Sequence, residues 1–79
     1  MNRKIKLIWE FSGPDAEKIA KHHTTHLEEF GIREKLELSV AGNEYINHIS
    51  WIAYLIVLEN EVITARDALK PLRAEIFED

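Results

Sequence analysis

The chain has 79 residues, of which 46% are hydrophobic and 30% are charged, so its composition is that of one small globular domain and not of a disordered chain. Its 14 acidic residues outnumber its 10 Lys and Arg residues, and the net charge of −4 argues against duplex DNA or an anionic membrane as the main partner. The absence of cysteine excludes disulfides, thiolate nucleophiles and Cys-ligated metal centres within these residues.

The longest apolar run, from Trp51 to Leu58, is far shorter than the ~20 residues of a membrane span. Residues 1–4 lead into only a short apolar run, which is not typical of a secretory signal, so we expect a cytoplasmic protein without a membrane partner. A domain of this size buries only ~60% of the surface of its unfolded chain. Without disulfides, oligomerisation is the common source of further stability.

The first half of the chain predicts a strand followed by a helix. Residues 4–11 alternate, and one side of the strand is apolar throughout: Ile5, Leu7, Trp9 and Phe11. Residues 12–15 break this pattern with Gly13 and Pro14, which suit the start of a helix. Apolar residues then recur every three or four positions, which predicts a helix over 14–30 that ends at Gly31.

The second half predicts two strands, a helix and an optional last strand. Residues 36–40 alternate as a short strand, and residues 41–44 have the composition of a turn. Residues 49–58 are apolar on both faces and rich in β-branched and aromatic side chains, as in a central strand. A helix is expected at about 61–70, and residues 74–77 could add a short edge strand.

This order predicts an α+β fold of the ferredoxin-like, split-βαβ type, with two helices on one face of an antiparallel sheet. The first and third strands are then neighbours, and we place Glu10 opposite His48. Odd-numbered residues of both strands face the helices in this register. Even-numbered residues form the open face: Lys4, Lys6, Ile8, Glu10, His48, Ser50, Ile52, Tyr54, Ile56 and Leu58.

The centre of this open face is too apolar for a monomer to leave in water. We therefore expect a homodimer that packs two sheets together and buries four residues: Ile8, Ile52, Tyr54 and Ile56. Any ligand pocket would lie between the sheets, with Tyr54, Ser50 and Ile52 as candidate binding residues. No nucleic-acid partner is expected, because Trp51 and Tyr54 have opposite parity and cannot both stack bases on one face.

Histidines are the main candidates for chemistry. His22 and His26 have the four-residue spacing of a two-histidine metal pair, but no HExxH pattern accompanies them, and a solvated helix flank is the favoured interpretation. His23 lies near the centre of the apolar stripe. It is expected to be buried near Trp9 or Trp51, either as a core residue or as a general base, whereas His22 should be exposed and His26 should lie at the stripe edge.

In the predicted register, Glu10 and His48 meet at one end of the open face, with Ser50 and Tyr54 nearby. A carboxylate beside an imidazole suits general acid–base catalysis, although a salt bridge at the rim is the favoured interpretation. The sequence contains no Gly-rich phosphate loop, nucleophile elbow or carboxylate cluster, and no cofactor is expected.

Two families share parts of this pattern. Ser12-Gly13-Pro14 after the first strand and Phe30-Gly31-Ile32 after the helix resemble the turns of ACT domains, which implies amino-acid binding. The Gly-Pro-Asp turn, the helix carrying His22, His23 and His26, and the apolar third strand resemble small dimeric α/β-barrel proteins, including YCII-related ones. That resemblance implies two protomers packed sheet on sheet. The Gly-rich segment of YCII-related proteins is not evident, so the resemblance extends to architecture and not to activity.

The leading hypothesis from sequence is therefore a homodimeric binding or interaction module. The alternatives are a small cofactor-independent enzyme that uses His48 or His23 as its base, and an ACT-like regulatory domain.

Overall fold

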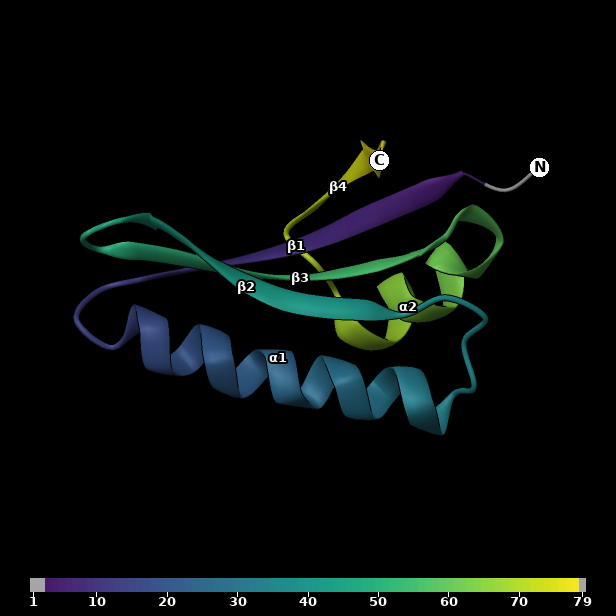
Figure 1. The fold of residues 1–79 in the computed structure, drawn as a ribbon, viewed down its shortest axis with the longest axis horizontal. Coiled ribbons are helices and arrows are strands. Elements are labelled where there is room, and N and C mark those ends of the chain that lie inside the picture. The colour runs from purple at the N-terminus through teal and green to yellow at the C-terminus, as the bar shows by residue number, and fades with distance from the viewer. Residues whose placement is uncertain (1–2, 79) are drawn as a thin grey trace.

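The computed structural model describes residues 3–78 and arranges them as a twisted sheet with both helices on one face (Figure 1). The elements follow in the order β1 (Lys4–Ser12), α1 (Ala16–Arg33), β2 (Val40–Asn47), β3 (Ser50–Leu58), a 3-10 turn (Glu59–Glu61), α2 (Val62–Leu69) and β4 (Arg73–Phe77). The strands form one antiparallel sheet in the order β2-β3-β1-β4. The predicted ferredoxin-like α+β fold is confirmed, and the optional last strand is present.

The pairing of β1 with β3 differs from the predicted register. Glu10 lies opposite Ile52, not opposite His48, so the prediction is wrong by four residues along β3. Pairing ends at Ser12 and Ser50, and His48 belongs to the turn between β2 and β3. Because four is an even number, the shift leaves every paired residue on its predicted face.

The second strand also lies later than predicted. Residues 36–40 are largely a loop, and residues 41–44, expected as a turn, belong to β2. The turn follows at Asn47, whose side-chain oxygen accepts a hydrogen bond of 3.0 Å from the Ile49 N–H. Gly42 has a packing role inside the strand, because a Cβ atom there would collide with the Tyr54 ring on β3. Long-range pairing therefore overrides the turn-like composition of this segment.

Helix α1 extends past its predicted end. Gly31 lies inside the helix, where a Cβ atom would collide with Ser39 in the loop that leads to β2. Phe30-Gly31-Ile32 is consequently not a turn, which removes one of the two ACT-like features. Gly13 does form the other turn, with a φ of 106° and its N–H bonded to the Ile49 carbonyl at 2.8 Å. Neither helix of residues 3–78 is long and apolar enough to cross a membrane.

The core lies between the helices and the odd-numbered side of the sheet. Its buried residues are Leu7, Trp9, Leu27, Phe30, Ala53, Leu55, Val57 and Ala65. The Trp9 indole N–H donates a 3.1 Å hydrogen bond to the Leu69 carbonyl and so ties the end of α2 to β1. Ile49, predicted in this layer, is 51% exposed because it belongs to the turn.

Candidate functional site

The open face of the sheet carries the apolar residues that the sequence assigns to it, but they are already covered. Ile8, Ile52 and Ile56 are 2%, 4% and 6% exposed, although neither helix lies over this face (Figure 1). Long side chains from neighbouring positions lie beside them. The Lys6 ammonium lies 4.6 Å from the centroid of the Tyr54 ring, which is opposite Ile8. An isolated chain therefore keeps the centre of this face dry.

The three candidate ligand-binding residues are shielded from water in the same way. Ser50 and Ile52 are buried, and the half-buried Tyr54 ring packs over Gly42. Two hollows on the surface of the protein, described below, are lined by other residues.

The predicted acid–base pair does not form. The Glu10 carboxylate is bonded to Arg73 of β4, with 3.3 Å between Oε1 and Nη1, while His48 lies exposed in the β2–β3 turn. The physical reason is the pairing of β1 with β3, which places Ile52 and not His48 opposite Glu10.

His22 and His26 lie side by side on the exposed side of α1. Their Nε2 atoms are 3.0 Å apart, and the rings meet edge to face with centroids 4.6 Å apart. The other ring nitrogen of His26, Nδ1, lies 3.3 Å from Oε1 of Glu29. The His26 side chain is 57% exposed and not at the edge of the buried stripe as predicted. Within residues 3–78, no group of three or more His, Cys, Asp or Glu residues is placed to hold a metal ion.

His23, in the same helical turn, faces the sheet. Its ring meets Trp9 at 5.0 Å and Phe11 at 5.5 Å between centroids, both edge to face. The residue is half-buried, and its buried Nε2 atom has no hydrogen-bond partner. Burial lowers the pKa of His23 below 6.5, and the neighbouring His26 and His22 lower it further. Trp51, the other predicted neighbour, instead packs against Tyr45.

The outer edge of β2 is a feature that the sequence did not reveal. β2 is the edge strand of the sheet, and several of its side chains are exposed: Val40 by 48%, Tyr45 by 59% and Ile46 by 46%. Sequence reasoning missed this edge because it assigned residues 41–44 to a turn. The alternation of Ala41, Asn43 and Tyr45 on one side of the strand was the available signal.

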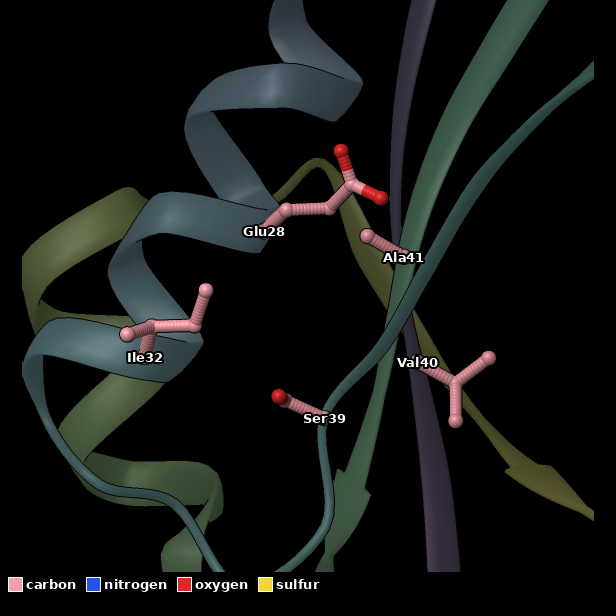
Figure 2. A pocket seen from close by; sticks show the side chains of 5 residues that line it. All are labelled: Glu28, Ile32, Ser39, Val40 and Ala41. Carbon is pink, nitrogen blue, oxygen red and sulfur yellow. The ribbon is translucent and has the colours of Figure 1, made fainter.

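A hollow of about 360 Å³ separates the start of β2 from the second half of α1. It is lined by Glu28, Ile32, Ser39, Val40 and Ala41. Figure 2 shows Glu28 and Ser39 extending into the space between helix and strand, whereas Val40 points away from the helix. Ile32, at the rim, is 78% exposed. The hollow is therefore an open, partly apolar recess beside the sheet edge.

Comparison of the chain with protein-family models, curated proteins and solved structures finds no match. The resemblances to ACT domains and to dimeric α/β-barrel proteins stay predictions.

Proposed function

We propose that this protein is an interaction module that forms a homodimer through the outer edge of β2. The observation that carries the proposal is an eight-residue edge strand whose exposed side chains match a second copy of the same strand. Proteins usually guard such edges with lysine, proline or a strong bulge. β2 has neither Lys nor Pro, carries one charge at Glu44, and has its irregularity only after Tyr45, near the hairpin turn.

Two β2 strands are complementary when they pair antiparallel about Asn43. Ala41 then lies opposite the partner's Tyr45. Opposite residues share a face of the sheet, so the partner's Tyr45 enters from the side of α1. That is the side of the hollow lined by Ala41 and Glu28.

The hollow suits a tyrosine in shape and chemistry. Ile32 offers apolar surface for the ring, and the exposed Glu28 carboxylate offers an acceptor for the phenol O–H. Each dimer would contain this contact twice by symmetry. Tyrosines that fill pockets at the centre of an interface commonly dominate its binding energy. The joined sheet also supplies the stability that a domain of this size otherwise lacks.

A cysteine at the proposed two-fold axis tests the register directly. The protein contains no cysteine, so Asn43→Cys introduces one thiol that should meet its own copy across the edge. Mild oxidation at tens of micromolar protein should give covalent dimer in high yield. Glu75→Cys, at an exposed position on the other edge strand, is the matched control and should stay monomeric on denaturing gels. Equal cross-linking of both variants would contradict the proposal.

Tyr45→Lys tests the contact with the hollow. Light scattering should show a dimer mass for the wild type and a monomer mass for the variant, with unchanged circular dichroism. Ile63→Lys places the same charge on an exposed position of α2 and should leave the dimer intact. A wild-type monomer at tens of micromolar would overturn the proposal.

The sheet-on-sheet dimer expected from sequence is the competing arrangement. It would bring together faces whose apolar centre is already covered, and it would desolvate Lys6, Glu10 and Arg73. That arrangement does not use Tyr45, so a dimer that survives Tyr45→Lys would favour it.

A further inference from the structure

The geometry points to a copper(II) site formed by His22 and His26 on the exposed side of α1, independent of the proposed dimer. Both Nε2 atoms can bind one ion only if their separation fits a chelate. Two nitrogens bonded at about 2.0–2.1 Å to one ion lie roughly 3 Å apart, so the 3.0 Å between these atoms is already close to a chelating separation. Copper(II) is the divalent first-row ion that nitrogen ligands bind most strongly, and its tetragonal geometry accepts two adjacent nitrogens.

Glu29 prepares His26 for this role. The Glu29 carboxylate lies 3.3 Å from Nδ1 of His26, and its negative charge favours the tautomer that carries the proton on that nitrogen. Nε2 of His26 then carries the free lone pair, directed toward His22. A carboxylate on the far nitrogen of a ligating histidine is the usual support for such a ligand, because it fixes the tautomer and raises the basicity.

In the metal-free protein the two imidazoles hydrogen-bond to each other. With the lone pair on His26, Nε2 of His22 must donate the proton in that contact. Binding of the ion moves this proton from Nε2 to Nδ1 of His22. Each imidazole ring therefore keeps one N–H proton. The rings meet edge to face with an interplanar angle of 84°, and each needs only side-chain rotation to aim its lone pair at the ion.

The other coordination positions are open. No third His, Cys, Asp or Glu of residues 3–78 completes the set, so water or a small ligand would occupy them. His22 also lines a surface hollow of about 490 Å³ with Asp15, Lys18 and Ile19, which leaves room for such ligands. His23 is adjacent in sequence, but its ring packs against Trp9 and Phe11 on the sheet.

Copper(II) titration of the chelator-treated protein tests the assignment, with calorimetry for affinity and electron paramagnetic resonance for ligand type. We expect one ion per chain and hyperfine splitting from two nitrogens. His22→Ala and His26→Ala should each weaken binding by about tenfold or more, and Glu29→Gln by a smaller factor. His48→Ala removes a lone exposed histidine and is the matched control, with unchanged affinity.

Thermal melting gives a second readout. Copper(II) should raise the melting temperature of the wild type and of His48→Ala, because an ion bound across one helical turn stabilises the folded state. It should not do so for His26→Ala. Wild-type affinity in His22→Ala, or an equal loss in His48→Ala, would overturn the site.

Discussion

The two faces of the sheet are similarly apolar at their centres, but different groups cover them. On the helix-facing side, Leu55 and Val57 are fully buried beneath α1 and α2. On the open side, Ile56 is 6% exposed without any helix above it. Its neighbours are side chains of the sheet itself, such as Lys6 directly opposite on β1.

This difference shows that a sequence can reveal an apolar strand face without revealing which groups shield that face from water. A helix, a partner chain or the long side chains of neighbouring strands can each exclude water from isoleucine. The helix layer is rigid and closely packed, whereas lysine and tyrosine on an open face can move. The two faces should therefore respond differently to the same loss of volume.

The largest expected effect comes from removing the same three carbons on each face. Leu55→Ala should lower the free energy of unfolding by about 2–5 kcal/mol, because the packed core cannot collapse into the cavity. Ile56→Ala, one residue along β3, should cost clearly less, since Lys6 and Tyr54 can settle into the space. Urea unfolding followed by tryptophan fluorescence measures both. Equal losses would mean that the open face is as rigid as the core.

Gly42→Ala tests the tyrosine cover of the open face. Alanine is normally the better strand residue than glycine, and propensity alone predicts a small gain. Here the new Cβ would collide with Tyr54, so we expect a loss of about 1–3 kcal/mol in unfolding free energy. Tyr54→Leu in the same chain should relieve the collision. If the unfolding free-energy costs of Gly42→Ala and Tyr54→Leu simply add in the double mutant, the packing of Tyr54 over Gly42 is contradicted.

His23→Leu should change how stability depends on pH. The folded-state pKa of His23 lies below its ordinary value of 6.5, so the unfolded chain binds more protons in that window. The contribution of His23 to the free energy of unfolding is therefore fully present above about pH 6.5. It is lost as the pH drops toward the folded-state pKa. His23→Leu should flatten this fall and, by removing a buried unpartnered nitrogen, raise stability at pH 8 by up to about 1 kcal/mol.

Denaturation at several pH values, with a chelator present, measures the slope. His48→Ala removes an exposed histidine and should keep the wild-type slope. A variant at His23 with an unchanged slope would show that another group titrates in this window.

The sequence predicted the fold and the two faces because both depend on period-two alternation, which any even register shift preserves. It could not predict the register itself. Glu10 fits opposite His48 or Ile52 equally well by pattern, and the choice depends on where the β2–β3 turn closes. That turn was misplaced because Gly42 and Asn43 look like a turn locally, while the Tyr54 ring that requires Gly42 is distant in sequence.

The histidine cluster was predictable in part. A four-residue spacing on a helix places His22 and His26 on one side, as the structure confirms. The contact of Glu29 with His26 was predictable as well, because residues three apart on a helix are neighbours on its surface. The unpartnered nitrogen of His23 was not predictable, because it depends on the position of Trp9 and Phe11 across the interface.

The smallest expected effect concerns the ion pair at the rim of the open face. The Arg73 and Glu10 side chains are 47% and 43% exposed, so water and salt screen their attraction. Glu10→Gln should lower the free energy of unfolding by about 0.2–1 kcal/mol at low salt, and the difference should shrink in concentrated salt.

The same substitution should have a larger effect on β4 than on the whole domain. β4 pairs with β1 over five residues, and a bond of 2.9 Å from the Leu72 N–H to the Ile8 carbonyl precedes it. Loss of the ion pair should speed amide exchange along β4 before it changes global unfolding, because short edge strands open locally. Unchanged exchange in β4 would mean that Tyr54 and Lys6 keep Ile8 dry without help from Arg73, and the cover of the open face would then come from β1 and β3 alone.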